Sequence, residues 1–519
     1  MTLQALYEEA LGSHKRGDLA AAENLYRQVL AAAPASFAAR HMLGVLRAQQ
    51  GALPEALELL ETALAQKPDA HDAQFNYGHV LKKVGRIPEA LAAFNKALDR
   101  KPDYGAALAG RAELLNLEGN RLRDGGQVSE ALACYERALG DAPFYADALN
   151  NRAVALWSMN RFDEALAGFD AALATNPRYV EAHYNRGNTL RDMSRLDEAM
   201  ASYDRAIAID PGFARAYCNK GFCALLRGDF AQGLPLYEWR KRSNPPVESR
   251  SYSQPLWTGR EDIRGKTLFL YIEQGLGDTI QFYRFVAPLL ERGAQVILSA
   301  QDKLLRLLEN AVPKVTLVGS TSVPARFDYH IPLASLPLAL GITADSIPRP
   351  DSYLRAEPGR VAKWRSRIGE KGFKIGICWQ GGRAGIAGRA MPLSCFQGLS
   401  RLDGVRLISL QKGFGTEQLG ALPCVESLGE EYDGGPHAFL DSAAVMESLD
   451  LVITLDSALA HLAGALGRPV WVALKQVPDW RWFLERSDSV WYPSMRLFRQ
   501  KSEGDWVSVF AKMEAEIRK

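Results

Sequence analysis

Apolar and small residues recur at helical spacing through the first half of the chain, and the pattern repeats about every 34 residues. Twelve residues before each repeat-ending proline lies an alanine, and twelve before that lies a glycine or another alanine. An aromatic residue usually follows four positions after the first of these alanines. Each repeat therefore predicts two helices that cross at small residues and end at a proline. The prolines are spaced by 34, 34, 41, 34 and 34 residues: Pro34, Pro68, Pro102, Pro143, Pro177 and Pro211.

This period and these positions resemble the tetratricopeptide repeat, in which stacked helix pairs form a superhelix with a concave, partner-binding face. About seven repeats fit within residues 1–242. The 41-residue interval has seven extra residues at about 103–111. Seven residues is close to two helical turns, so we expect a longer first helix whose buried face keeps its direction.

Four asparagines stand two residues before the small residue of a repeat: Asn76, Asn151, Asn185 and Asn219. We expect this position to face the groove, where amide groups pair with an extended peptide backbone. The arrangement resembles the asparagine ladder in the repeat arm of O-GlcNAc transferase, which holds acceptor polypeptides. The alternative is that each asparagine bonds to the neighbouring repeat.

After residue 242 the pattern changes to short apolar, β-branched runs, which are typical of buried parallel strands. Prolines and serines make 243–258 a linker. Two Rossmann-like domains are then predicted, at 259–360 and 361–519. In the first, we expect a strand at 267–272 and a helix at 280–291. A final helix at 506–517 is expected to return to the first of these domains.

Residues 451–474 predict a strand, a small-residue helix at 458–466, and a second strand. Asp456 or Ser457 would cap the helix, which begins at Ala458. A helix N-terminus at the carboxyl edge of such a sheet binds phosphate, and His461 would add a donor one turn in. The alternative is that His461 only caps or packs.

The first strand-to-helix turn, 273–279, is rich in glycine. Gly275 and Gly277 would let the backbone turn sharply and approach a ligand. Asp278 is a candidate general base, and the alternative is a simple N-cap. A second glycine-rich loop, 381–389, ends in Arg389 and would suit a diphosphate, and the alternative is an ordinary solvated loop.

Two further candidates lie in the second domain. Gln411 and Lys412 follow the strand at 405–410, where Lys412 would reach a phosphate. His437 is a second candidate histidine, although a loop histidine is more often incidental.

The segment 456–469 resembles the nucleotide-sugar site of the ADP-heptose:lipopolysaccharide heptosyltransferases. Their pattern is Asp-Thr-(Gly/Ala)-x-x-His, followed by Gly-x-Pro. This chain keeps it in Asp456, Ser457, Ala458, His461, Gly467 and Pro469, with serine in place of threonine.

The resemblance implies a GT-B fold of two Rossmann-like domains, a nucleotide-sugar donor, inversion at the anomeric carbon, and Asp278 as base. The 380–389 loop lacks the asparagine, histidine and aspartate that relatives usually have. No Asp-x-Asp follows residue 250, which indicates a metal-independent reaction without a cofactor. Bacterial flagellin glycosyltransferases share this layout, so the expected reaction glycosylates Ser or Thr of a protein, with flagellin as one acceptor. The alternatives are an envelope-glycan transferase, for example one acting on lipopolysaccharide, and a non-catalytic scaffold.

Charge and cysteine content limit the classes of partner and the cellular compartment that the sequence predicts. A net charge of +2 over 519 residues does not suit a nucleic-acid or membrane-surface binder. Six cysteines without a CxxC pair indicate a reduced compartment, and no apolar run is long enough for a membrane span. These features predict a cytoplasmic protein.

Overall fold

The computed structural model describes residues 2–243, 250, 252–311, 314–381 and 389–519. The chain forms two compact units, Met1–Thr189 and Leu190–Lys519. Repeat helices make up the first unit, and the second contains the last repeats together with two parallel sheets. The repeat period runs to about residue 242, so the repeats and the compact units divide the chain at different residues. Most of the glycine-rich loop before Arg389 lies outside the described residues.

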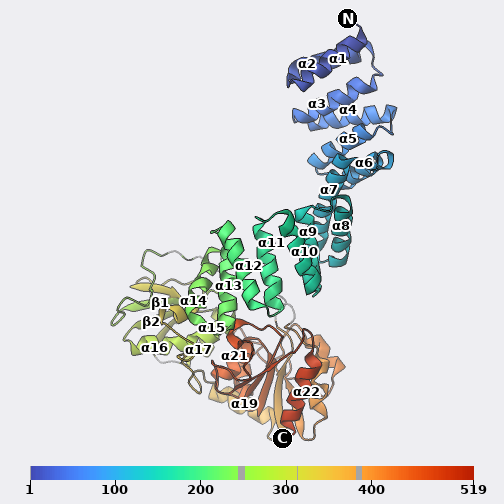
Figure 1. Ribbon diagram of the computed structural model, residues 1–519. Coiled ribbons are helices and arrows are strands. Elements are labelled where there is room, and N and C mark those ends of the chain that lie inside the picture. The colour runs from blue at the N-terminus through green and yellow to red at the C-terminus, as the bar shows by residue number, and fades with distance from the viewer. Residues whose placement is uncertain (1, 244–249, 251, 312–313, 382–388) are drawn as a thin grey trace. The chain divides into compact units, whose positions relative to one another are not determined.

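The first unit is a stack of helix pairs, as the tetratricopeptide pattern predicted (Figure 1). Small residues let the paired helices approach: a Cβ added at Gly78 would lie 3.1 Å from the Phe94 ring. The helices are α1 Leu3–Lys15, α2 Leu19–Ala32, α3 Phe37–Gln49, α4 Leu53–Gln66, α5 His71–Lys83, α6 Ile87–Arg100, α7 Gly105–Asp124, α8 Val128–Asp141, α9 Ala146–Ser158, α10 Phe162–Thr175 and α11 Val180–Asp192, which crosses the unit boundary.

The extra seven residues lengthen the first helix of their repeat, as expected. Helix α7 has 20 residues, whereas α5 and α9 have 13 each. The added turns also pack closely, because a Cβ at Gly110 would lie 2.8 Å from the Phe94 ring of the preceding repeat. The insertion therefore keeps the helix face that its neighbours need.

The second unit begins with the last repeats, which pack on the sheet-bearing part. Helix α13 contacts the short helix η8, and α14 contacts α18. In the last repeat Gly233 stands where the other repeats have alanine, and a Cβ there would lie 2.5 Å from the Leu225 side chain. The elements are α12 Leu196–Ile209, α13 Ala214–Leu226, α14 Phe230–Tyr237, η1 Glu238–Arg242, α18 Leu336–Ala339 and η8 Trp480–Trp482.

The first sheet has four parallel strands in the order β3-β2-β1-β4. Its central strand β1 is almost wholly buried, which explains the apolar run in the sequence. The strands are β1 Thr267–Tyr271, β2 Gln295–Ser299, β3 Val315–Val318 and β4 Tyr329–Pro332. The helices are α15 Leu276–Phe282, α16 Val286–Glu291 and α17 Leu305–Glu309.

The single helix expected at 280–291 is instead two helices joined by the 3₁₀ turn η2, Tyr283–Phe285. Pro288 explains the break, because it has no amide hydrogen for the carbonyl four residues earlier. Arg284 also uses its Nε to donate to the Gln281 carbonyl at 2.8 Å. The break leaves α15 a short helix whose first turn carries Asp278.

The second sheet has five parallel strands in the order β6-β5-β7-β8-β9. Every residue of β7 and β8 is buried, as the unbroken apolar runs predicted. The strands are β5 Phe373–Cys378, β6 Val405–Ser409, β7 Leu451–Leu455, β8 Val470–Leu474 and β9 Met495–Arg499. The helices are α19 Pro358–Ile368, α20 Leu440–Met446, α21 Ala458–Ala465 and α22 Trp506–Ile517.

The final helix α22 packs on β9 and on the short helix η5, Leu393–Gln397, both of which belong to the second sheet's part of the chain. Phe510 meets Phe396 edge-on at a centroid distance of 4.7 Å. The expectation that this helix returns to the first sheet is therefore wrong. Over the described residues, no helix combines the length and apolar character that crossing a membrane requires.

Candidate active site

Helices α15 and α21, one from each sheet, pack against each other. A Cβ added at Gly277 would lie 3.0 Å from His461 Cδ2 and 3.2 Å from Ala458 Cα, so glycine allows this close approach. Gly275 is the N-cap of α15 and has an ordinary φ of −71°, so its conformation does not itself require glycine. Gly277 serves the contact between the two helices.

The first turn of α21 has no side-chain cap. Ser457 occupies the N-cap position, but its Oγ lies 3.1 Å from Thr454 Oγ1. Asp456 turns toward Arg389, whose Nη2 lies 2.9 Å from Asp456 Oδ2. The prediction that Ser457 caps the helix is therefore wrong. An uncapped first turn offers its amide hydrogens, at the positive end of the helix dipole, to an anion.

Five side chains of alternating charge lie beside this turn, in the order Asp278, Arg481, Asp479, Arg389 and Asp456. Arg481 Nη2 donates to Asp278 Oδ1 at 2.5 Å, and Arg481 Nη1 donates to Asp479 Oδ1 at 2.8 Å. Arg389 Nη2 lies 3.5 Å from Asp479 Oδ2. Three carboxylates thus share two guanidinium groups. We call this set the charge chain.

Two acids of the charge chain, Asp456 and Asp479, differ in pKa. Burial raises the pKa of Asp456 above its ordinary value, and Arg389 offsets only part of this effect. Burial also acts on Asp479, but Arg481 and Arg389 together hold the pKa of Asp479 below its ordinary value. The difference follows from geometry, because Asp479 contacts two guanidinium groups and Asp456 contacts one.

Asp278 is the acid of the charge chain that a substrate reaches most easily. Its side chain is 26% exposed, compared with 15% for Asp479 and 10% for Asp456. Asp278 Oδ2 accepts the Gly275 amide hydrogen at 3.0 Å, which fixes the carboxylate at the start of α15. Each carboxylate oxygen has a further lone pair that accepts a third hydrogen bond. Asp278 therefore combines a fixed position with capacity to receive a proton.

His461 is buried and packs against aromatic rings. Its ring stacks on Trp482 at a centroid distance of 5.4 Å, and its Nδ1 lies 3.0 Å from the Tyr492 hydroxyl. Burial lowers the pKa of His461 well below its ordinary value, and Arg481 and Arg284 act in the same direction. The imidazole is therefore neutral at neutral pH, and it offers an anion a hydrogen bond but no charge.

The tautomer of His461 depends on the direction of its hydrogen bond with Tyr492. The Tyr353 hydroxyl donates to the Ile280 carbonyl at 2.9 Å, so the Tyr492 hydroxyl has two acceptors in reach. These are Tyr353 Oη at 3.4 Å and His461 Nδ1 at 3.0 Å, and the shorter bond goes to His461. If the Tyr492 hydroxyl donates to Nδ1, the proton of the neutral ring is on Nε2, and if it donates to Tyr353, the proton is on Nδ1.

A cavity of about 470 Å³, which we call the Asp278 cavity, brings most of the predicted site together. Its walls include the turn before α15, the first turn of α21 and the charge chain. The predicted residues that line it are Gly275, Gly277, Asp278, Arg389, Asp456, Ser457, Ala458 and His461.

The sequence missed several residues of the Asp278 cavity. Trp480 and Arg481 come from η8, Asp479 is the N-cap of η8, and Phe222 and Tyr237 come from the last repeat. One signal was available: the segment 479–483 places an acid and an arginine among three aromatic residues. The repeat pattern gave no such signal, because Tyr237 holds the aromatic position that packs in the other repeats.

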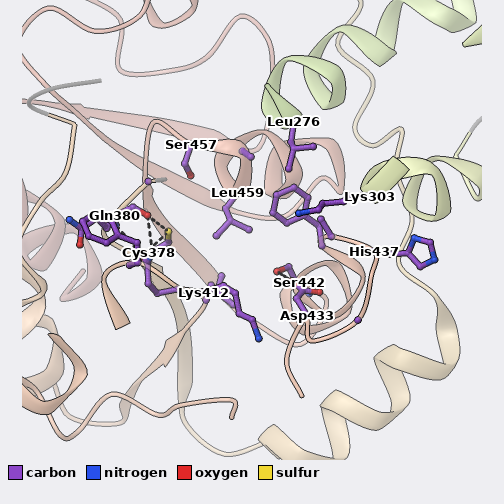
Figure 2. A pocket seen from close by; sticks show the side chains of 18 of the residues that line it. Leu276, Lys303, Cys378, Gln380, Lys412, Asp433, His437, Ser442, Ser457 and Leu459 are labelled. Atoms are coloured by element: carbon purple, nitrogen blue, oxygen red, sulfur yellow. Dashed lines mark hydrogen bonds between the residues drawn. The ribbon is translucent and has the colours of Figure 1, made fainter. Parts of the chain in front are cut away.

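A second cavity of about 390 Å³, the Lys412 cavity, adjoins the first and shares Leu276, Ser457 and Ala458 with it. Figure 2 shows that the Lys412 side chain extends into this cavity from the carboxyl end of β6. Lys412 Nζ donates to the Tyr432 and Glu430 carbonyls at 2.6 and 3.2 Å. An ammonium group has three hydrogens, so one remains for a ligand.

Gln411 lines the same cavity, but its amide is committed to the backbone of the chain. Its Oε1 accepts the Trp379 and Gln380 amide hydrogens at 3.2 and 3.0 Å. Its Nε2 donates to the Gln380 and Phe414 carbonyls at 2.9 and 2.7 Å. These bonds fix the turn after β5. Binding of the donor by Gln411 stays a prediction. In the structure, Gln411 shapes the wall of the Lys412 cavity.

The N-terminus of α20, also at the Lys412 cavity, is already occupied. Asp433 Oδ1 accepts the Asp441 and Ser442 amide hydrogens at 2.8 and 3.4 Å. These two amide hydrogens of α20 are therefore already paired within the chain. His437 lies exposed on the loop between Asp433 and α20, and in Figure 2 its ring points out of the cavity.

Three of the predicted asparagines form bonds between successive repeats. The amide Nδ2 of Asn151 donates to Asn116 Oδ1 at 2.9 Å, and that of Asn185 donates to Asn150 Oδ1 at 3.1 Å. Asn76 Nδ2 lies 2.9 Å from His41 Nε2. The alternative of repeat-to-repeat bonding is thus observed for these three, and their binding of a peptide stays a prediction. The fourth, Asn219, lies on α13, three residues before Phe222.

Comparison with known families matches both halves of the chain. Models described as tetratricopeptide repeat match residues 13–75 and five overlapping stretches between 54 and 239. A model described as glycosyltransferase family 9 (heptosyltransferase) matches residues 435–474. The chain therefore carries tetratricopeptide repeats followed by a segment similar to family 9 glycosyltransferases. That segment contains β7, α21 and β8, and the turn of Asp278 lies outside it.

Individual relatives cover parts of the chain. Protein FlbA of Caulobacter vibrioides is 28% identical over 292 residues, which is 50% of this chain and 48% of FlbA. The chain thus spans about half the length of this relative. Among solved structures, YrrB, a TPR protein with an unusual peptide-binding site, is 24% identical over 38% of this chain and 97% of its own, with a TM-score of 0.31. PilF of Pseudomonas aeruginosa is 18% identical over 41% and 94%, with a TM-score of 0.32.

Proposed function

We propose that this protein is a GT-B glycosyltransferase of two Rossmann-like domains, which transfers a sugar from a nucleotide-sugar donor to Ser or Thr of a protein. One observation carries the proposal: the uncapped first turn of α21 lies where the Asp278 and Lys412 cavities meet. A site for a diphosphate, flanked by one cavity for a nucleoside and another for a sugar with its acceptor, is what this reaction requires.

The donor's diphosphate would lie at the amide hydrogens of Ser457 and Ala458. The nucleoside would occupy the Lys412 cavity, with the Lys412 ammonium near the phosphates. The sugar would extend into the Asp278 cavity, where His461 would offer a hydrogen bond. Arg389 would contribute positive charge to the site. Its guanidinium would then be shared between the ligand and Asp456.

The reaction would be a single displacement. The Asp278 carboxylate takes the proton of the acceptor hydroxyl, and the hydroxyl oxygen forms a bond to the anomeric carbon. The bond between that carbon and the diphosphate oxygen breaks, so the configuration inverts and a nucleoside diphosphate leaves. The helix dipole of α21 and the nearby cations stabilise the charge on the leaving group. We propose that this needs neither a metal ion nor a cofactor.

The acceptor would reach Asp278 along the last repeat. Asn219 and Phe222 are three residues apart on α13 and so share one face of the helix. Phe222 lines the Asp278 cavity, which makes that face continuous with the site. An extended peptide following this face would bring a hydroxyl toward Asp278. Flagellin is the acceptor that the layout suggests, and a glycan of lipopolysaccharide or of the envelope is the alternative.

Changing Ser457 to aspartate tests the diphosphate site. An aspartate at the N-cap stabilises a helix, but its carboxylate would fill and repel the anion position. We expect Ser457→Asp to weaken nucleoside diphosphate binding about 10- to 100-fold and to keep the fold, as an anion competitor at a helix N-terminus should. Titration calorimetry with UDP, ADP, GDP and CDP measures the affinities.

The matched control is Ser457→Ala, which adds no charge and should bind the preferred nucleotide like the wild type. Equal affinity of Ser457→Asp and wild type would place the diphosphate elsewhere. If the wild type binds no nucleotide of the panel, the scaffold alternative is favoured and the proposed transferase function fails.

The double variant Asn185→Ala/Asn219→Ala tests the protein acceptor. If these amides hold the acceptor backbone, KM for a long Ser/Thr peptide should rise about 10-fold while kcat is kept, because uniform binding is lost. KM for a short acceptor should not change. Asn24→Ala, an exposed change on α2, is the control. An unchanged KM for the long peptide, together with activity on a saccharide acceptor, would favour the envelope-glycan alternative.

A further inference from the structure

The repeat array ends in a buried ion pair with the turn that leads from β1 to Asp278. Arg240, in η1, has a side chain only 3% exposed, and that of Glu273 is 1% exposed. Arg240 Nη2 donates to Glu273 Oε2 and to Ser335 Oγ, both at 2.7 Å, and Nη1 donates to Glu238 Oε1 at 2.6 Å. The planar guanidinium therefore bridges three groups at once.

Glu273 is the first residue of the turn 273–278, which ends at Asp278. The next residue, Gln274, donates from Nε2 to the Tyr237 hydroxyl at 2.6 Å. From the other side, Gln301 donates from Nε2 to the Gln274 carbonyl at 3.0 Å. The turn is thus held between the last repeat and the residues after β2. Neither Arg240 nor Glu273 lines the Asp278 cavity, so neither is arranged to touch a substrate.

A buried ion pair is a poor source of stability, because removing both charges from water costs about as much as their attraction returns. What the ion pair provides is a defined geometry for its partners. The guanidinium fork accepts only a narrow range of positions for its carboxylate partners. Since one of those partners opens the turn of Asp278, the pair fixes that turn against the last repeat.

We propose that Arg240 is a positioning residue of the transferase site: through Glu273 it holds the turn that aims Asp278 into the cavity. The expected effect of Arg240 on sugar transfer rests on the proposed function. It makes the last repeat a structural part of the site as well as the place where an acceptor would arrive.

The test uses the full-length protein with Arg240→Lys. Lysine keeps the charge but cannot bridge Glu238, Glu273 and Ser335 in the same geometry. We expect kcat for transfer to fall about 10- to 100-fold, as small misplacements of a catalytic group do, with KM for the donor within about threefold of wild type. Amide exchange should become faster at 273–279 and stay unchanged at 458–465. Glu273→Gln, which keeps one acceptor oxygen, should show a smaller effect in the same direction.

The control is Arg242→Lys, two residues along in η1, where the guanidinium lies over the Trp239 ring at 4.7 Å and is exposed. It should leave both kcat and exchange unchanged. Unchanged exchange at 273–279 in Arg240→Lys overturns the proposal. So does faster exchange throughout 190–519 with a parallel loss of nucleotide binding, which indicates general destabilisation. Absence of nucleotide binding by the wild type overturns the proposed function instead, and exchange at 273–279 still decides whether Arg240 holds the turn.

Discussion

Replacing Asp278 by asparagine should slow sugar transfer about 10³-fold, the contribution expected of a lost general base. The amide has nearly the same shape and still accepts one hydrogen bond from Arg481, but it takes no proton from an acceptor hydroxyl. Nucleotide affinity should stay within about threefold, because the proposed diphosphate site is the first turn of α21 and does not include Asp278. Initial rates at saturating donor, together with calorimetry, separate the two effects.

Asp302→Asn is the matched control for this change. Asp302 also follows a strand of the first sheet and also accepts a backbone amide hydrogen, from Ser320 at 2.9 Å, but it lies outside the Asp278 cavity. It should transfer sugar at the wild-type rate. If Asp278→Asn also retained the wild-type rate with its fold intact, the base would have to be another group, and Asp479 would be the next to test.

Replacing Arg481 by methionine should cost about 3–5 kcal/mol of stability, because it leaves buried carboxylates without their partner. Arg481 donates to Asp278, Asp479 and Gln281 and lies over the Trp480 ring at 4.8 Å. Methionine fills a similar volume with no donor. Transfer should also be lost, since the Asp278 carboxylate loses the contact that orients it. Denaturant unfolding of wild type and variant measures the difference.

The stability lost in Arg481→Met should depend on pH, and the loss should be smaller at lower pH. In the wild type the pKa of Asp479 lies below its ordinary value, so this acid adds stability above that value and loses it as the pH falls. Without Arg481, burial dominates and raises the pKa of Asp479, so the variant gains stability as the pH falls. The difference in free energy of unfolding between wild type and Arg481→Met should therefore become smaller as the pH falls from ~7 to ~4.

Arg486→Met is the control for the stability measurement. Arg486 Nη2 donates to Asp488 Oδ2 at 2.6 Å, the two side chains are 45% and 59% exposed, and such surface pairs contribute about 0–1 kcal/mol. It should change stability little at any pH. An Arg481→Met protein as stable as wild type at pH 7 would show that the charge chain does not govern the fold of the site.

Periodicity in the sequence predicted the architecture well. The 34-residue period located the helix pairs, and the extra seven residues lengthened α7 as expected. The runs at 451–474 predicted β7, α21 and β8, because a strand buried on both faces must be apolar throughout. The errors were local: Pro288 breaks the helix after β1, and α22 packs on the second sheet.

The sequence did not predict which side chains of the site pair with one another. It marked Asp278 and Arg389, but their common neighbours Asp479 and Arg481 lie about 200 and 90 residues further along the chain. No spacing rule joins such positions, which only the folded chain brings together. The same reason explains Gln411 and Lys412, whose bonds to backbone carbonyl and amide groups depend on turns that the sequence does not specify.

The division of the compact units has a practical consequence for making chimeric proteins. The linker at 243–258 looks like the natural place to exchange the arm for that of another protein. A junction there would remove Tyr237 from the cavity wall and Arg240 from its partner Glu273. A chimera joined between α10 and α11, upstream of the second compact unit, would keep both. Arms with different recognition surfaces are therefore interchangeable only as far as that junction, and the final repeats must stay with the sheet-bearing part of the chain.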